Sequence, residues 1–305
     1  MDLNIENCFG NKEITSVTVN KTDTVAFLRS TIISLYKLEK IDFNRIGLSL
    51  ETKKEYSLEE PKKIFLSENS KTLEQYGVQS GDKIKLKDLG IQINWRLVYV
   101  IEYLGPLFIV LFMFVFNKNF ENSTHRILLF FMSTLHYLKR VLESMFLHEF
   151  SRYTMPLKNL LINCTYYWGV YGLVCGYFLF LSDSTNSNSH FLGDFKYVLV
   201  LLFLLSEYKN YVCHKILKDL KSENNGQRGI PKGDAFEFVS CANYFYESCS
   251  WMFFSLFANH LSCYVFWIFG TFIMASWAND RHRSYLKTFG EKYPKNRKRI
   301  IPFIY

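Results

Sequence analysis

The sequence predicts an α-helical membrane protein in which a small soluble α/β domain precedes a bundle of about six to seven membrane-spanning helices. The net charge of +8 comes from 36 Lys and Arg against 28 Asp and Glu. Residues 1–93 contain 14 of each kind, so the whole excess lies after them. Apolar residues gather in the same part, in stretches on the order of 20 residues, which is the length that crosses a bilayer. A chain that is 49% hydrophobic and 18% aromatic is neither disordered nor collagenous.

Residues 1–88 are predicted to form a β-grasp domain. Alternating patterns predict strands over 3–8, 13–20, 46–50 and 82–89, and helical spacing predicts a helix over 23–38. Asp23 and Thr24 supply an N-cap where that helix begins. The segment KTLEQYGVQSGDKIKLKDLG resembles the end of ubiquitin, which makes a ubiquitin-like fold the expectation. The first residues are too polar for a signal peptide, so we expect this domain to stay cytosolic.

Residues 89–305 are predicted to form the membrane domain. Its apolar stretches are 95–116, 126–150, 157–181, 195–217, 236–259 and 261–278. Lys and Arg gather in alternate connections and in the tail, whereas 182–194 contains none, and this asymmetry predicts cytosolic N- and C-termini. Membrane lipid is therefore an expected partner. Nucleic acid is not, because its binding would require basic residues on the neutral soluble domain.

Ionisable side chains inside predicted spans are costly, by roughly 2.5–3.5 kcal/mol each, and indicate a functional site. Glu102, Tyr137, Asn243 and Glu247 are the strongest candidates, because a carboxylate in an apolar run needs a partner. The spans also contain His136, Lys139, Arg140, Glu143, His148, Glu207, Lys209, Asn210 and His214. For Lys139, Lys209 and Lys215 we expect the side chains to reach the membrane interface instead.

Missing motifs narrow the chemistry. The sequence contains neither a G-x-G-x-x-G after a strand nor a P-loop, and its histidines are not clustered as a di-iron enzyme requires. The seven cysteines show no C-x-x-C, so no metal site is predicted. The chemistry that remains is that of positioned Tyr, Glu, Asn and Arg around an organic cofactor.

The C-terminal segment HRSYLKTFGEKYPKNRKRIIPFIY closely resembles the signature of the membrane steroid 5α-reductase family. The blocks DLGIQINW, LHYLKRVLESMFLHEFS and SCANYFYESCSW are similar to the enoyl-CoA reductases of this family, which also begin with a ubiquitin-like domain. The resemblance implies NADPH-dependent reduction of the 2,3 double bond of a long-chain or very-long-chain trans-2-enoyl-CoA, the last step of fatty acid elongation. It also implies an endoplasmic-reticulum membrane location and contact with the other enzymes of the elongation complex.

The resemblance also assigns roles to residues. It implies that Glu102 and Tyr137 bind the substrate carbonyl and that a tyrosine of the block SCANYFYESCSW is the catalytic acid. We favour Tyr246 over Tyr244, because Tyr246 shares more of a helical face with Asn243 and Ser250. The implied cofactor-binding residues are Asn210, Asn243, Glu247 and Tyr285, with His282, Arg228 and Lys221 for its phosphates.

The sequence departs from the family pattern at two of these places. Gly229 stands where the family has an arginine, with Arg228 beside it, and His214 stands where the steroid enzymes have an acidic residue. Two alternatives stay open: a steroid or polyprenol double-bond reductase with the same machinery, and a non-catalytic scaffold of the elongation complex.

Overall fold

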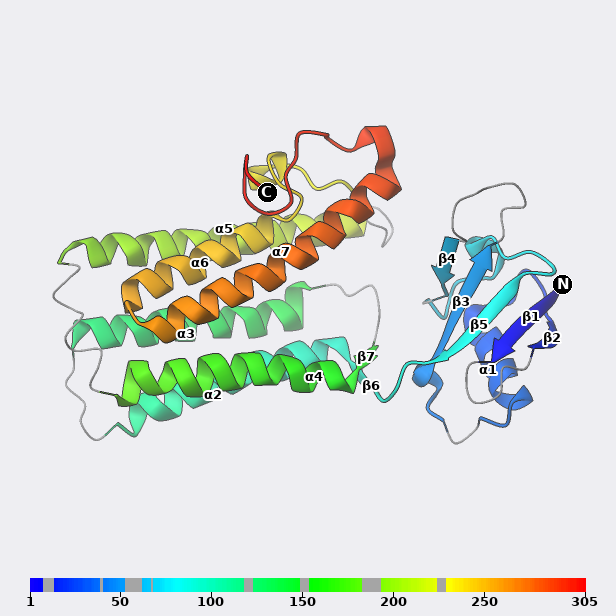
Figure 1. The fold of residues 1–305 in the computed structure, drawn as a ribbon, viewed down its shortest axis with the longest axis horizontal. Coiled ribbons are helices and arrows are strands. Elements are labelled where there is room, and N and C mark those ends of the chain that lie inside the picture. Colours follow the sequence, from blue (N-terminus) through cyan, green and yellow to red (C-terminus); the bar gives the residue numbers. More distant parts are fainter. Residues whose placement is uncertain are drawn as a thin grey trace. The chain divides into compact units, whose positions relative to one another are not determined.

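A computed structural model describes residues 1–7, 14–38, 41–52, 62–66, 68–117, 123–148, 154–182, 193–223 and 229–305. These residues form two compact units (Figure 1). One contains residues 1–95 together with 154–159, and the other contains the remaining helices.

The N-terminal unit contains a five-stranded mixed sheet in the order β2-β1-β5-β3-β4. Its strands are β1 (Asp2–Asn7), β2 (Ile14–Thr18), β3 (Ile46–Thr52), β4 (Lys62–Phe65) and β5 (Lys83–Asp88). β1 and β5 run parallel at the centre, and the other pairs are antiparallel. This order, with a helix after the first hairpin, confirms the ubiquitin-like β-grasp fold.

Helix α1 (Val25–Leu35) packs on this sheet through Val25, Leu28 and Ile32, which share one core with the strand residues. The predicted cap is confirmed, because the Thr24 hydroxyl accepts a hydrogen bond of 3.2 Å from the Phe27 amide. Short 3₁₀ turns, η1 (Phe43–Arg45) and η2 (Glu74–Tyr76), precede β3 and β5. Strand β4 was not predicted, because KKIF is an edge strand too short to show an alternating pattern.

A second, two-stranded sheet pairs β6 (Gln92–Asn94) with β7 (Thr154–Pro156), and it was also not predicted. Ile93 lies opposite Met155, and the Leu157 amide donates to the carbonyl of Ile91 at 2.8 Å. The residues that precede the helices α2 and α4 are thereby held together. Three-residue strands carry too little pattern to be found in a sequence.

The C-terminal unit is helical, and each of the six predicted apolar stretches falls on a helix. The helices are α2 (Trp95–Val115), α3 (Thr124–Leu142), α4 (Leu157–Cys164), α5 (Phe195–Glu223), α6 (Ala242–Ala258) and α7 (Leu261–Phe289). α3 continues as a π-helical turn, η3 (Glu143–Leu147), and α4 as the π-helical segments η4 (Thr165–Cys175) and η5 (Tyr177–Leu181). Short 3₁₀ turns, η7 (Asp234–Glu237) and η8 (Gly290–Lys292), precede α6 and follow α7.

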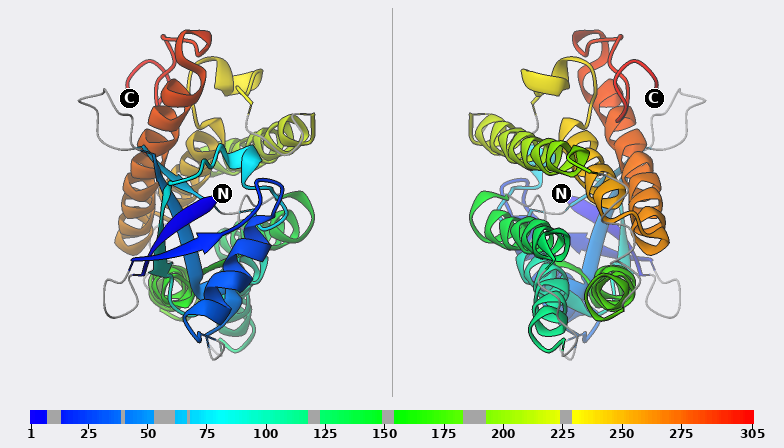
Figure 2. Two further views of the ribbon diagram at one scale, coloured as in Figure 1. Left: turned by 90° about the vertical axis from the view of Figure 1, so that its right-hand side faces the viewer. Right: turned by 90° about the vertical axis from the view of Figure 1, so that its left-hand side faces the viewer.

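Three helical segments of the described residues are long and apolar enough to cross a membrane. They are Trp95–Val115, Leu157–Leu181 and Leu261–Lys292. Helices α3, α5 and α6 contain most of the ionisable side chains predicted to form a site. Figure 1 shows these helices running alongside the apolar ones within the unit, and Figure 2 shows the same bundle from its two ends. The membrane-spanning bundle is therefore made of apolar helices and of helices with polar faces.

Aromatic side chains fill the centre of this bundle. Trp251 lies 4.7–5.8 Å, between ring centroids, from Tyr137, Tyr171, Phe254 and Phe266. These rings come from α3, η4, α6 and α7, so one tryptophan joins four helical segments. Edge-on and tilted arrangements of this kind favour aromatic pairs by about 0.5–1.5 kcal/mol beyond burial.

Gly105 on α2 provides a stability test. A methyl group there would meet the Trp168 ring at 1.9 Å, and that ring donates a 3.1 Å hydrogen bond to the carbonyl of Ile101. We expect Gly105→Ala to lower the thermal midpoint by several degrees, because displacing Trp168 costs on the order of 1–3 kcal/mol. Gly169→Ala is the control, since nothing lies within 4 Å of the added methyl group. Equal midpoints in a detergent melt of the two variants would contradict the packing.

Candidate active site

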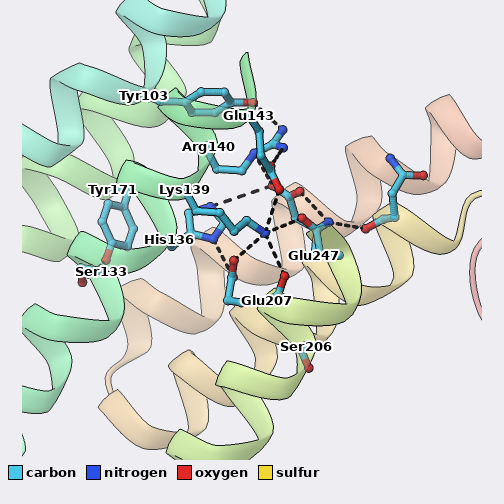
Figure 3. A network of polar contacts seen from close by, with 12 residues as sticks. Tyr103, Ser133, His136, Lys139, Arg140, Glu143, Tyr171, Ser206, Glu207 and Glu247 are labelled. Carbon is cyan, nitrogen blue, oxygen red and sulfur yellow. Dashed lines mark hydrogen bonds and ion pairs between the residues drawn. The ribbon is translucent and has the colours of Figure 1, made fainter. Parts of the chain in front are cut away.

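One face of α3 carries a buried row of charged side chains. His136, Lys139, Arg140 and Glu143 follow the spacing that places side chains above one another on a helix. They meet Glu207, Asn210 and His214 from α5, Glu247 from α6 and Tyr103 from α2 (Figure 3). We call these nine residues the buried polar cluster.

Lys139 lies inside this cluster. Its ammonium group contacts Glu207 Oε2 at 2.8 Å, Asn210 Oδ1 at 2.6 Å and Glu143 Oε1 at 3.6 Å. The prediction that Lys139 reaches the interface is therefore wrong. Glu207 on the neighbouring helix α5 offers the ammonium group a nearer partner than the lipid headgroups do. The sequence could not reveal this partner, because the contact forms only when α3 and α5 pack together.

Arg140 has the largest set of partners in the cluster. Its guanidinium donates to Glu143 Oε2 at 2.8 Å and to the Tyr103 hydroxyl at 2.9 Å, and its Nε lies 3.6 Å from Glu247 Oε1. The side chain is 7% exposed. A guanidinium is suited to such a position because its donors point in several fixed directions at once.

His136 is held by one nitrogen only. Its Nδ1 lies 2.8 Å from Glu207 Oε1, and since an ionised carboxylate only accepts, Nδ1 carries the hydrogen. Within the described part of the chain, the other nitrogen, Nε2, is buried without a hydrogen-bond partner, and its nearest charged neighbour is Glu247 Oε1 at 4.0 Å.

The π-helical turn η3 places Glu143 between Arg140 and His214. Glu143 Oε2 lies 3.0 Å from His214 Nδ1, and the rings of His214 and His148 are 4.7 Å apart between centroids. Three possible metal-ligand atoms lie within 4.8 Å of one another here, one each from Glu143, His148 and His214. The sequence did not reveal this grouping. Arg140 donates to the same carboxylate oxygen and lies 3.5 Å from His214 Nδ1. A metal ion would be repelled by that guanidinium, so the grouping fits an ion-paired cluster better than a metal centre.

Tyr137 is fully buried beside the cluster, and its hydroxyl has no hydrogen-bond partner among the residues that the structure describes. The neighbouring Tyr171, whose ring centroid is 5.0 Å away, shares a 2.6 Å hydrogen bond with Ser133. Burying a hydroxyl without a partner costs about 1–3 kcal/mol. The Tyr137 hydroxyl is thus a donor that the protein itself does not use.

The structure brings four of the predicted residues to this region. Asn210 donates to Glu247 Oε2 at 3.3 Å and to the Asn243 carbonyl at 2.8 Å. Glu102 is buried one residue before Tyr103, and its Oε2 accepts from Asn163 at 2.8 Å. Asn210, Asn243 and Glu247 therefore form one hydrogen-bonded group across α5 and α6, with Glu102 on α2 beside the cluster member Tyr103.

Tyr246 is not part of the buried polar cluster. Its hydroxyl donates to Asp234 Oδ1 at 2.5 Å, and Asp234 Oδ2 accepts from Lys209 at 2.6 Å. Burial opposes ionisation of Asp234, but the hydrogen bonds from Lys209 and Tyr246 outweigh it and lower the pKa of this carboxyl. Lys209 thus has a protein partner, where we predicted a contact with the membrane interface.

Of the remaining residues predicted to bind the cofactor, the structure describes Tyr285, His282 and Lys221, and these lie elsewhere in the helical unit. His282 Nδ1 shares a 2.6 Å hydrogen bond with Ser240 Oγ, and Tyr285 stacks on Tyr293 with centroids 5.3 Å apart. Lys221 is in the last turn of α5. Arg228 lies outside the described residues.

Comparisons with known proteins identify the family. The profile of the family described as 3-oxo-5-alpha-steroid 4-dehydrogenase matches residues 153–305. The very-long-chain enoyl-CoA reductase of Dictyostelium discoideum is 36% identical over 310 residues, covering 100% of this chain and 99% of its own. A probable very-long-chain enoyl-CoA reductase of Caenorhabditis elegans is 38% identical over 80% of this chain and 83% of its own.

Among solved structures, the ubiquitin-like domain of an Arabidopsis thaliana protein covers 30% of this chain and 79% of its own, with 19% identity and a TM-score of 0.23. The full-length match to the Dictyostelium protein extends the similarity beyond the part that the family profile covers. The chain therefore belongs to the 3-oxo-5-alpha-steroid 4-dehydrogenase family, alongside its members that carry the name enoyl-CoA reductase.

Proposed function

We propose that this protein reduces the 2,3 double bond of long-chain and very-long-chain trans-2-enoyl-CoA with NADPH, as the last step of the fatty acid elongation cycle. The observation that carries the proposal is the unused, fully buried hydroxyl of Tyr137. It lies next to the cluster member His136, among the rings of Tyr171 and Trp251, in a chain whose most similar relatives include a very-long-chain enoyl-CoA reductase. Reduction of an α,β-unsaturated thioester needs a donor of this kind at the oxygen where negative charge develops.

The residues around Glu247 fit the carboxamide of a nicotinamide ring. Glu247 Oε1 has its nearest charged partners at 3.6 and 4.0 Å, longer than hydrogen bonds, so it can accept from a bound amide. Asn210 donates to the other oxygen of the same carboxylate and to the Asn243 carbonyl, and we propose that the two asparagines orient the ring. Tyr285, His282, Lys221 and Arg228 remain our proposed contacts for the rest of the cofactor.

Bound NADPH would supply the hydride that adds to the β carbon. As negative charge moves to the thioester oxygen, the Tyr137 hydroxyl donates a hydrogen bond to it, and Glu102, held by Asn163, borders the same carbonyl. The α carbon then takes a proton, for which we propose Tyr246. The Asp234 carboxylate keeps this phenol protonated, and the contact from Asp234 to the partly exposed Lys209 gives a route by which the proton can be replaced.

We further propose that the protein lies in the endoplasmic-reticulum membrane with both termini in the cytosol, in contact with the other enzymes of the elongation complex. The three apolar helices support a membrane location. Charge asymmetry along the sequence supports the orientation.

The direct test is NADPH oxidation by the purified protein in micelles, with a long-chain trans-2-enoyl-CoA and a 3-oxo-4-ene steroid supplied side by side. Turnover of the thioester alone supports the proposal. Turnover of the steroid alone would establish a steroid reductase, the alternative that the family description favours. Oxidation with neither would point to a scaffold of the elongation complex.

Tyr246→Phe is expected to remove most of this turnover, by about 10²–10⁴-fold, while NADPH still binds, because general acid catalysis contributes about that much. Tyr244→Phe is the matched control from the same helix. Wild-type turnover by Tyr246→Phe would assign the proton to another group.

A further inference from the structure

We propose that His136 is a second catalytic donor of this site, with its Nε2 hydrogen-bonded to the thioester oxygen of the acyl-CoA beside the hydroxyl of Tyr137. This inference rests on the proposed function. Its starting point is that His136 is 1% exposed and that Nε2 is buried without a hydrogen-bond partner. A nitrogen in this state is costly unless a ligand pairs with it.

The orientation of the ring leaves Nε2 for the ligand. Nδ1 is committed to Glu207, so the ring cannot turn without breaking a 2.8 Å contact to a buried carboxylate. Glu207 is itself fixed by Lys139 at 2.8 Å. A histidine whose other nitrogen is held by a carboxylate has a defined tautomer and direction, the arrangement in which this side chain acts as a proton carrier in enzymes.

The charges of the cluster favour a donor at Nε2. Glu143, Glu207 and Glu247 face the permanent cations Lys139 and Arg140, which leaves one negative charge in excess. Of the two histidines in the cluster, His136 lies between two carboxylates, Glu207 at 2.8 Å and Glu247 at 4.0 Å, whereas His214 has Arg140 at 3.5 Å.

His136 and Tyr137 both pack against the ring of Trp251. The His136 ring lies 4.5 Å and the Tyr137 ring 5.8 Å from the ring of Trp251, between centroids, and the two rings are 5.1 Å from each other. Each has a buried polar atom without a hydrogen-bond partner. A thioester oxygen bound there would lie beside both the Tyr137 hydroxyl and His136 Nε2 as its charge develops.

The test uses two isosteric variants and a matched control. In His136→Asn the amide replaces Nδ1 and keeps the contact to Glu207, but nothing reaches the position of Nε2. In His136→Gln the amide reaches that position. His125→Gln is the control, because His125 is a buried histidine on the same helix with two unpartnered nitrogens, stacked on Phe257 and eleven residues away from His136.

The first measurement is binding, in lipid nanodiscs without NADPH, of an acyl-CoA and of the thioether analogue that lacks the carbonyl. We expect the wild type to prefer the thioester, and His136→Asn to lose roughly fivefold of that preference, the value of about one hydrogen bond. His125→Gln should keep the wild-type preference. Equal preferences in all three proteins would overturn the proposal.

The second measurement is turnover with NADPH and with NADPH deuterated at the transferred hydrogen. Removing one donor from the developing oxyanion should lower turnover by about 10²–10³-fold and raise the deuterium isotope effect, because hydride transfer becomes rate-limiting. A merely structural histidine would lower the active fraction and leave the isotope effect unchanged, which would refute the proposal. If the wild type does not oxidise NADPH with enoyl-CoA, the proposed function itself fails. If the wild type does and the His136 variants match it, only the role of His136 fails.

Discussion

Arg140→Met is expected to destabilise the helical unit by about 3–5 kcal/mol, because it leaves buried carboxylates without their cation. Arg140 donates to Glu143 at 2.8 Å and lies 3.6 Å from Glu247, and each of these residues is less than a tenth exposed. Methionine fills a similar volume, so the loss is one of charge and not of packing. The measurement is the thermal midpoint of the protein in detergent, and turnover should be lost together with stability.

A second substitution separates charge balance from damage to the fold. Arg140→Met combined with Glu143→Gln restores the original balance of charges and should recover much of the lost midpoint. Activity should not return, because Glu247 still lacks the guanidinium that lies 3.6 Å from it in the wild type. Arg45→Met in the N-terminal domain serves as the exposed control. Arg45 contacts Asp88 at 2.6 Å with side chains that are about one third exposed, and such pairs contribute little because solvent screens them. A midpoint of Arg140→Met equal to that of the wild type would show that water, and not Arg140, compensates the carboxylates.

Tyr137→Phe should give the opposite combination, a loss of turnover by about 10²–10³-fold with unchanged or higher stability. Its hydroxyl is fully buried without a hydrogen-bond partner, so removing it relieves a desolvation cost of about 1–3 kcal/mol. A tyrosine that only stabilises the fold would instead lose stability on this substitution and keep its turnover. Stability sacrificed at a position that binds a ligand is the usual trade-off between folding and activity.

Tyr171→Phe is the matched comparison, because its hydroxyl shares a 2.6 Å hydrogen bond with Ser133 in the same aromatic core. This variant should lose about 0.5–1.5 kcal/mol of stability and keep its turnover. Melting curves and NADPH oxidation measured on both variants decide the matter. Tyr137→Phe with a lowered midpoint and full activity would remove Tyr137 from the site.

The periodicity of apolar residues in the sequence was sufficient to predict the longer helices and strands. The apolar runs predict the six long helices, and alternation with the Thr24 cap predicts β1, β2, α1, β3 and β5. The strands β4, β6 and β7 were missed because each has three or four residues and is defined by its partner on another segment. Backbone pairing over such a distance leaves no local pattern.

For the site, the sequence reveals which side chains are too polar for their surroundings. Glu102, Tyr137, Asn243 and Glu247 were identified by that contrast, and in the structure Glu102, Tyr137 and Glu247 are buried and Asn243 is half-buried. Lys139 was wrongly predicted to reach the membrane interface, because for a lysine on an isolated helix that interface is the nearest polar environment. The spacing of His136, Lys139, Arg140 and Glu143 on one helical face was a signal that could have corrected this.

The sequence by itself determined the two-part organisation of this protein, the position of its helices and the list of residues that lipid would not tolerate. These follow from local periodicity and from the cost of burying charge, which belong to each segment on its own. Tertiary structure alone decided how the polar residues pair, since Arg140 and Glu247, or His136 and Glu207, lie on different helices more than seventy residues apart. It also decided which atoms remain without a partner, because an unused donor such as the Tyr137 hydroxyl is defined by everything packed around it.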